Sequence, residues 1–489
     1  MTIQLQKAIT VDIIKLNNNL LTGGFMKKGF LKGKFSYGVG AIGLDLSYGM
    51  FYSELAKYMT DILRLNNKFL LLITPLARIW DGINDPMMGT IVDNTHTKMG
   101  KYRPWLLIGS VCNAVVLSLL FTNPGFEIGG LPLHIYTAFL YVFWGMTNTM
   151  ADIPYWSMVP SFTSDPNERN IIATIARAFS GLGQGIISIL TPVMLPLFSE
   201  TIYNGEKIAD ARGYSLWAII CAFCLVGFSS FTVARTKERH IAKPKEKFTF
   251  KKMFSIAKNN DQLLIFMLFA MLSNAGWYMV SGVAVYYFDV VVGDPAKRSL
   301  FNTIGAVGSI LGLLVVPIMT KFTSRRRTYQ FSLSMAILGF VGMLISAKAA
   351  NSLMAMNFCY LAASIGVASM FVAQTVFLAD IVDYGEIKMG FRSESIIFSM
   401  KGFLQKMAYT IQTIILFTAL EISHYDGTLH NLNPESAKNA ISAMMLVIPA
   451  MLILLSLIIF TTKFKLHGKY MEDITAEITK KREAETVGE

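Results

Sequence analysis

Two acidic side chains stand one helical turn apart inside an otherwise apolar stretch. Asp81 and Asp85 are four residues apart, so a helix carries both on one face. Like charges so placed repel each other, and a medium of low dielectric strengthens the repulsion. A bound monovalent cation, a shared proton or the nearby Arg78 can compensate. Carboxylates suit hard cations and Asn84 offers a further oxygen, which predicts a site for Na⁺ or a proton; a purely structural Arg78–Asp81 pair is the alternative.

Two other segments combine a carboxylate with an aromatic ring. Asp45 shares a helical face with Tyr52, seven residues on, and Thr149, Asp152 and Trp156 share another. An aromatic ring can pack on the apolar face of a sugar while a carboxylate accepts hydrogen bonds from its hydroxyls. The segments therefore predict a site for a polyol. Helix packing by Tyr52 and an interfacial anchor at Trp156 are the alternatives.

The elements that carry these residues are long apolar stretches. Hydrophobic residues make up 53% of the 489 residues and charged residues 16%, whereas soluble proteins have about 25% charged residues. About 20 apolar residues match the hydrocarbon core of a bilayer, where a backbone must satisfy its own hydrogen bonds. We expect an all-α polytopic membrane protein with twelve transmembrane helices, at 35–61, 66–92, 103–123, 132–160, 170–196, 213–234, 262–290, 299–321, 327–348, 352–385, 394–422 and 437–464.

Two basic residues inside these stretches need acidic partners. Arg177 lies among small and apolar residues, and Asp45 or Asp152 are candidates to pair with it. Lys406 lies near the middle of another stretch, where it could pair with carboxylates of the N-terminal half. A charge at the bilayer centre costs about 2.5–3.5 kcal/mol or more, so such residues are candidates for function by default. Structural ion pairs buried in the bundle are the alternative.

The charged connections predict how the chain is oriented and divided. The net charge is +12, and basic residues cluster in alternate connections. The positive-inside rule puts these connections and both termini in the cytoplasm. The expected parts are a cytoplasmic N-terminal segment at 1–34, a six-helix bundle at 35–234, a cytoplasmic middle loop at 235–261, a second six-helix bundle at 262–464 and a soluble or disordered cytoplasmic tail at 465–489.

Other classes of function find little support. The chain lacks a basic domain interleaved with aromatic residues, so we expect no nucleic-acid partner. It has neither a His-Glu-x-x-His motif nor a paired serine and histidine nucleophile, so we expect neither an enzyme nor a cofactor. Cys221 and Cys224 have the spacing of a redox motif, but no βαβ pattern surrounds them, and all four cysteines are expected to pack in helices.

Five ordered segments resemble the melibiose permease branch of the glycoside–pentoside–hexuronide:cation symporter family, within the major facilitator fold. They are RIWDGINDPMMG at 78–89, GKYRPW at 100–105, WGMT at 144–147, DIPYW at 152–156 and ADIVDYGE at 379–386. The likeness runs from about 35 to 465. It implies a secondary active transporter of the cell inner membrane, embedded in lipid, that carries a sugar or glycoside with Na⁺ or H⁺ by alternating access.

The resemblance also implies roles for individual residues. Those that match the cation site are Asp81, Asp85, Asn84 and Thr149. Those that match the sugar site are Asp45, Tyr52, Asp152, Trp156 and Arg177, while Lys406 matches a lysine that links the two sites. Those that match the gating network on the cytoplasmic side are Asp380, Asp383, Glu386 and Arg392, and we group Arg78 with them.

The chain departs from the family pattern in the sugar site. Leu44 stands where the melibiose permeases have a lysine, and Phe371 where they have a cavity tryptophan. Lys401 adds a charge to the helix that bears Lys406. Together with Arg177, these bases suggest an anionic sugar, such as a uronide or a short acidic oligosaccharide. A carrier of lysolipids or other amphiphiles is the alternative, since the fold family includes lipid carriers.

Overall fold

The computed structural model describes residues 28–163, 166–203, 205–238, 255–256, 258–348, 352–390 and 394–487. In the first half, one long helix is interrupted by two π-helical turns and runs to Ile62. The elements are α2 (Lys28–Gly49), η1 (Met50–Glu54), α3 (Leu55–Lys57), η2 (Tyr58–Ile62), α4 (Asn67–Asp93), α5 (Arg103–Leu120), α6 (Leu131–Ser157), α7 (Val159–Phe162), α8 (Pro166–Phe198), β1 (Ile202–Tyr203), β2 (Glu206–Lys207) and α9 (Ala211–Arg235).

The second half is helical as well, and two further π-helical turns lie in it. Its elements are α11 (Asp261–Tyr286), η3 (Tyr287–Val291), α12 (Lys297–Met319), α13 (Arg325–Lys348), α14 (Leu353–Met389), α15 (Glu394–Ile422), η4 (His430–Leu432), α16 (Glu435–Ser442), η5 (Ala443–Val447), α17 (Ile448–Lys463) and α18 (Gly468–Val487). Each of the twelve ranges expected to cross the membrane coincides with helix. The tail is not the unstructured extension that its charge suggested, because α18 buries Ile474 and Ile478 and packs on α14.

Nine helices in the described part of the chain are long and apolar enough to cross a membrane. The three expected spans not among them are 35–61, 66–92 and 132–160, which carry the predicted site acids Asp45, Asp81, Asp85 and Asp152. Polar side chains that face a bundle interior lower the mean hydropathy of their helix without touching lipid. The chain is a polytopic α-helical membrane protein, and the number twelve stays a prediction.

Several helices begin at a side chain that caps their first turn. Asp210 at the start of α9 accepts a hydrogen bond from the backbone N–H of Gly213 at 2.9 Å. Partial burial would raise the pKa of Asp210, but this bond and that from Thr201 hold it below its usual value. Asn66, Asn260 and Ser352 cap α4, α11 and α14 in the same way.

The start of α5 is capped by a residue distant in the sequence. The Glu238 carboxylate accepts the backbone N–H groups of Lys101, Tyr102 and Arg103 at 2.7–2.9 Å. An acid at this position also complements the positive end of the helix dipole. The chain that leaves α9 is therefore fastened to the connection between α4 and α5.

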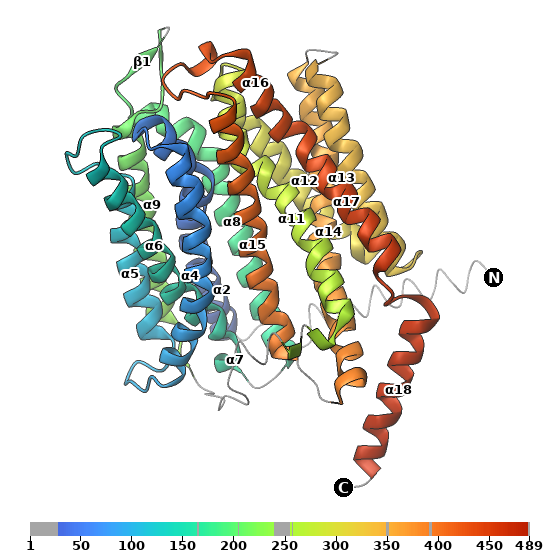
Figure 1. Ribbon diagram of the computed structural model, residues 1–489. Helices are drawn as coiled ribbons and strands as arrows, with labels where there is room; N and C mark the ends of the chain where they lie inside the picture. The colour runs from blue at the N-terminus through green and yellow to red at the C-terminus, as the bar shows by residue number, and fades with distance from the viewer. Residues whose placement is uncertain are drawn as a thin grey trace.

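Contacts between helices divide the bundle into two groups. In the first half α2 packs on α8 and α9, and α5 packs on α6 and α9; in the second, α14 packs on α12 and α13, and α11 packs on α17. Figure 1 shows the first group, in blue to green, beside the second, in yellow to red. Across the two groups, α4 contacts α15 and α8 contacts α12. This is the two-bundle architecture expected for the major facilitator fold.

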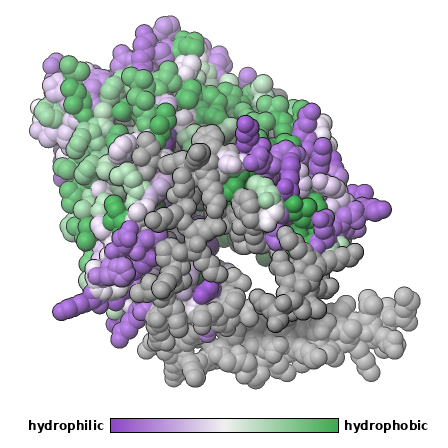
Figure 2. Space-filling view, turned by 60° about the horizontal axis from the view of Figure 1, so that its bottom comes forward, coloured by the Kyte–Doolittle hydropathy of each residue, from purple (hydrophilic) through white to green (hydrophobic). Residues whose placement is uncertain are grey.

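The two ends of the bundle can be told apart by their connections. We call the end with α18 and the connection between α4 and α5 the tail end, and the end with the β1–β2 hairpin and α16 the hairpin end (Figure 1). Figure 2 turns the tail end forward: hydrophilic residues gather there, and hydrophobic residues cover the flank above it. Exposed apolar side chains of several helices include Phe139, Phe223, Leu338 and Phe358. An apolar flank between polar ends suits a bilayer.

Candidate functional site

Glycines bring the helices with the predicted site acids close together. A Cβ atom at Gly145 of α6 would lie 2.5 Å from Oδ1 of Asp81 on α4, so this carboxylate occupies the space that a larger residue would fill. A Cβ atom at Gly183 of α8 would lie 2.9 Å from Cβ of Asp45 on α2. The helix that bears Arg177 therefore lies directly against the helix that bears Asp45.

Asp81 is buried and bound to a base on its own helix. Its Oδ2 lies 2.7 Å from Nη1 of Arg78, and both side chains are at most 5% exposed. Arg78 also donates hydrogen bonds to the hydroxyls of Tyr52 and Tyr141, at 3.4 and 3.3 Å. The rings around its guanidinium, at 5.2–5.8 Å, are Phe51, Tyr52, Tyr141 and Tyr409. The Arg78–Asp81 pair left open by the spacing is present in this conformation.

Asp85, one turn further along α4, has partners on two other helices. Its Oδ1 accepts a hydrogen bond from Thr149 of α6 at 2.9 Å, and its Oδ2 lies 2.5 Å from Nζ of Lys406 on α15. Because α15 belongs to the second half, this ion pair joins the two halves. It agrees with the expectation that Lys406 pairs with a carboxylate of the N-terminal half.

The predicted cation ligands therefore adjoin one another on α4 and α6. Asn84 lies between the two acids in the sequence and is buried. Its Nδ2 has no hydrogen-bond partner among the described residues. Within the described ranges, no three His, Cys, Asp or Glu side chains converge as a metal site. Two carboxylates with hydroxyl and amide groups nearby fit one monovalent cation better than a divalent metal. In this conformation Arg78 and Lys406 neutralise the two carboxylates.

The predicted sugar residues of α6 and α8 form a stack. Trp156 Nε1 donates a hydrogen bond to Oδ1 of Asp152 at 2.9 Å, and the guanidinium carbon of Arg177 lies 3.8 Å from the centroid of the indole ring. Asp45 is within electrostatic reach of Asp152 and Arg177. A direct ion pair between Arg177 and either acid is not among those the described residues make within 4 Å. The indole ring binds both Arg177 and Asp152 instead.

The second half contributes basic residues near the predicted sugar site. Lys401 of α15 donates a hydrogen bond to Thr375 Oγ1 of α14 at 2.7 Å, and Thr375 in turn donates to the carbonyl of Phe371 at 3.1 Å. Lys401 is within electrostatic reach of Arg177, and Lys406 of Asp152. Bases and acids from both halves thus come within electrostatic reach of one another, and their side chains are exposed or half-buried, so that the region they form is accessible. Phe371, which is half-buried, lies one turn before Thr375 on α14.

Tyr52 lies nearer to the cation acids than the sequence suggested. Its hydroxyl accepts a hydrogen bond from Arg78, and its ring packs edge-on against Tyr409 of α15 with centroids 4.5 Å apart. A second edge-on contact is with the buried Trp144. Tyr52 therefore links the surroundings of Asp81 to the second half.

The predicted gating residues of α14 lie toward the tail end. Asp380 is buried and pairs with Arg325 of α13 at 2.8 Å, and Asp261 of α11 pairs with Lys388. Both pairs join helices of the second half, so in this conformation they do not bridge the halves. The other predicted members are Asp383 and Glu386, which are half-buried on α14, and Arg392, which lies outside the described residues. Their gating role stays a prediction.

A charged cluster at the hairpin end was missed by the sequence analysis. Glu54 pairs with Arg298 at 2.9 Å, and Lys57 pairs with Asp61 and, at 2.6 Å, with Asp289. One signal was available, since Glu54, Lys57 and Asp61 follow each other at spacings of three and four near the end of the first expected helix. Their partners in the second half could not be read from that spacing.

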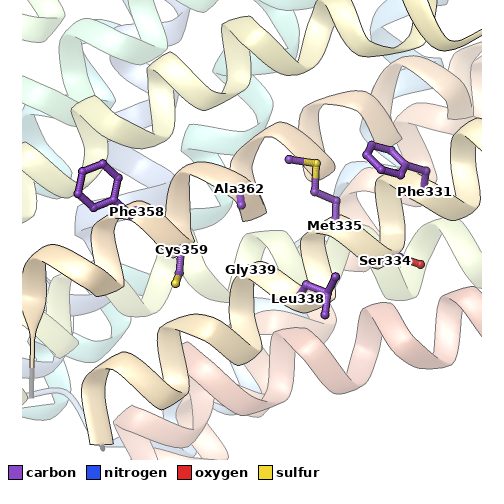
Figure 3. A pocket seen from close by; sticks show the side chains of 8 residues that line it. All are labelled: Phe331, Ser334, Met335, Leu338, Gly339, Phe358, Cys359 and Ala362. Carbon is purple, nitrogen blue, oxygen red and sulfur yellow. The ribbon is translucent and has the colours of Figure 1, made fainter. Parts of the chain in front are cut away.

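An apolar groove of about 460 Å³ lies elsewhere, between α13 and α14. Figure 3 shows its lining residues: Phe331, Ser334, Met335, Leu338, Gly339, Phe358, Cys359 and Ala362. None of them is charged, and none was predicted for the site. The groove does not fit a polar substrate.

Known proteins are similar to this chain over most of its length. A family model described as MFS/sugar transport protein matches residues 36–468. A raffinose carrier protein of Pediococcus pentosaceus is 26% identical over 461 residues, which cover 91% of this chain and 71% of that protein. The uncharacterized symporter YjmB of Bacillus subtilis (strain 168) is 28% identical over 476 residues, which cover 94% of this chain and 98% of that protein.

Among solved structures, the xylose transporter XylE from E. coli, in a partially occluded inward open conformation, is similar to this chain with a TM-score of 0.61. The match covers 91% of this chain and 99% of that one, at 10% sequence identity. At this identity the likeness concerns the fold alone.

Proposed function

This chain belongs to the MFS/sugar transport protein family, and from that premise we propose that it is a secondary active transporter of a glycoside or oligosaccharide, coupled to Na⁺ or H⁺. The two halves rock about a central site, which opens to each side of the membrane in turn. The tail end faces the cytoplasm in this proposal, because its connections carry the excess of lysine and arginine. The hairpin end then faces outward.

The Lys406–Asp85 ion pair is the observation that carries the proposal of cation coupling. Lys406 comes from the opposite half and is 24% exposed, so it can withdraw from Asp85. Arg78, at 3% exposed, is enclosed by aromatic rings and stays with Asp81. A coupling ion that binds Asp85 and Thr149 takes over the charge that Lys406 provides. Lys406 thus acts as an internal counter-charge, which the ion displaces.

The displaced lysine links the ion to the sugar. Lys406 is already within electrostatic reach of Asp152, which is bound to Trp156. Released from Asp85, the ammonium adds positive charge to the region that holds Arg177 and raises its affinity for an anion. By thermodynamic reciprocity, a bound anionic sugar then raises the affinity for the ion by the same factor.

The positive charges of this region support an acidic sugar as the substrate. Arg177 and Lys401 come from opposite halves and repel each other across the accessible region. A carboxylate between them removes this repulsion, while Asp45 and Asp152 remain to accept hydrogen bonds from sugar hydroxyls. The alternative, a lysolipid carrier, is less well supported, since an alkyl chain beside these charged groups displaces their water without replacing its hydrogen bonds.

The driving force suffices for accumulation. A monovalent cation that moves down about 100 mV provides about 2.3 kcal/mol. A tenfold concentration ratio costs about 1.4 kcal/mol, so one ion carried with one neutral sugar supports more than tenfold accumulation even without an ion gradient. One ion carried with a monoanionic sugar moves no net charge, so accumulation of that sugar draws on the ion gradient.

Uptake into proteoliposomes tests the proposal. A panel of neutral galactosides and acidic glycosides is offered with a Na⁺ gradient, with a pH gradient and with neither. We expect a gradient of one ion to drive accumulation of an acidic glycoside. Uptake confined to neutral galactosides would contradict the acidic substrate, and uptake indifferent to both gradients would contradict symport.

A further inference from the structure

The hairpin end closes where the helices have π-helical turns. Glu54 lies in η1, Asp61 in η2 and Asp289 in η3. Such turns are rare in proteins and often mark functional sites. Three of them bring acids from both halves to one place, which indicates that this end does more than pack.

Two buried ion pairs join the halves there. Glu54 lies 2.9 Å from Arg298 of α12, with side chains 3% and 7% exposed. Lys57 lies 2.6 Å from Asp289, with side chains 9% and 8% exposed. The Lys57 ammonium also pairs with Asp61 of its own helix. Any opening of this end must separate both pairs and let water reach the charges.

The connection between α15 and α16 covers the cluster. Tyr425 donates its hydroxyl hydrogen bond to Asp61, at 2.9 and 3.0 Å from the two oxygens. A Cβ atom at Gly427 would lie 2.5 Å from Oδ1 of Asp61, so the backbone of the connection rests on this carboxylate. The connection belongs to the second half and Asp61 belongs to the first. The connection therefore helps to hold the two halves together at the hairpin end.

His430 in this connection completes the charge balance. Lys57, Asp61 and Asp289 together carry one positive and two negative charges, whereas Glu54 and Arg298 balance each other. Nδ1 of His430 lies 3.2 Å from one oxygen of Asp289 and 3.3 Å from the other. A protonated imidazole there brings the cluster to neutrality, and histidine changes charge between about pH 5 and 8.

The backbone holds this histidine in an uncommon conformation. His430 has φ of +45°, a region that few residues other than glycine adopt. Asn433 fixes it by donating a hydrogen bond from Nδ2 to the His430 carbonyl at 2.9 Å. His430 binds Asp289, which pairs with Lys57 of the first half, and local strain kept beside such a contact is typical of a functional position.

We propose that this cluster is the outer gate of the transporter and that protonation of His430 locks the gate shut. The inference rests on the alternating-access function proposed above. With a neutral imidazole the closed gate buries a net negative charge, which favours opening into water. With an imidazolium the charges balance, so acid outside the cell holds the hairpin end closed. The other titratable groups that face the cluster are Tyr214 of α9, Tyr286 of α11 and Tyr425.

The distance between the halves at the hairpin end reports on the gate. One spin label is attached at Glu127→Cys in the first half and another at Glu435→Cys in the second. The distance between the two labels is measured in the full-length protein in nanodiscs, without sugar, at about pH 5.5 and about pH 8. The native cysteines are first replaced by alanine: Cys112, Cys221, Cys224 and Cys359. We expect the ratio of closed to open protein to be about fivefold or more higher at the lower pH.

Two histidines of the same connection form a matched pair of variants. His430→Asn tolerates the positive φ but cannot become charged, so the pH response should disappear. His424→Asn is the control, because His424 also has a positive φ, +56°, but is exposed, and its variant should keep the full response. Asp289→Asn removes the partner of the imidazolium and should also abolish the response.

A pH response that persists in His430→Asn would overturn the inference, as would its absence in the parent protein. These measurements need no substrate. A failure to find transported sugar would therefore contradict the proposed function and leave the gate result standing.

Discussion

The carboxylate of Asp85 in the first half binds the ammonium of Lys406 in the second half at 2.5 Å. This single ion pair connects the predicted cation site to the helix that also carries Lys401. The first prediction concerns what happens when the lysine is removed.

Lys406→Gln should separate ion binding from sugar accumulation. Without the ammonium, the coupling ion no longer competes for Asp85, so its affinity should rise, while gradient-driven accumulation should fall about tenfold or more. Ion titration of the purified protein and uptake into proteoliposomes measure the two effects. Lys348→Gln, at an exposed position at the end of α13, is the control and should change neither. A parallel loss of ion affinity and uptake would point to misfolding instead.

The two acids of α4 should differ in what they contribute to stability. Asp81→Asn leaves the enclosed Arg78 guanidinium without its charged partner, which should cost about 3–5 kcal/mol of stability. Asp85 is 35% exposed, so Asp85→Asn should cost only about 1 kcal/mol. Thermal melting of both variants checks the order. Cation-stimulated uptake should be lost in Asp85→Asn, and normal stimulation in that variant would mean that the ion assignment is wrong.

Gly145→Ala should disable transport through sterics alone. The new Cβ atom would meet Asp81 Oδ1 at 2.5 Å and push the carboxylate or the helix away, at a cost of about 1–3 kcal/mol. Gly227→Ala is the matched control, since nothing lies within 4 Å of a Cβ atom there. Uptake rates and expression levels of the two variants are compared. Equal uptake would show that α4 and α6 can move apart without loss of function.

Lys401→Gln should change which sugar is carried. Removal of this charge should raise the KM for an acidic glycoside about tenfold, and leave that for a neutral one unchanged, because a charged hydrogen bond contributes about 1.5–3 kcal/mol. The test is competition between the two glycosides in the same vesicles. An equal change for both would mean that Lys401 supports the helix and does not select the substrate.

The helices could be predicted well from the sequence, and the partners of charged residues only in part. Apolar length determines where a chain crosses a bilayer, which is why the twelve expected ranges all meet helix. Asp81 and Asp85 are four residues apart, and this local spacing is enough to predict that they share one face of a helix. The pairing of Lys406 with a carboxylate of the first half could be anticipated, since a charge in lipid needs an opposite one.

The hairpin-end cluster could not be predicted in this way. Glu54 and Arg298 are 244 residues apart, and charges near a helix end are expected at a membrane surface whether or not they pair. The π-helical turns leave no mark in the spacing of apolar residues. The stack of Arg177 on Trp156 was missed for a related reason, because the sequence offered two acids as the obvious partners. In α18 the four-residue spacing of Ile474 and Ile478 places both on one helical face, and this face is the one that is buried.

The two ion pairs of the cation site have an electrical consequence. With Arg78 on Asp81 and Lys406 on Asp85, the vacated site is electroneutral, so its reorientation moves no net site charge through the membrane field. The charge of the cargo alone therefore decides whether the voltage acts on the inward step, and the voltage hardly acts on the return. A neutral glycoside carried with one ion should give a current that rises with voltage until the return step becomes the slower one, whereas a monoanionic glycoside carried with one ion should give none.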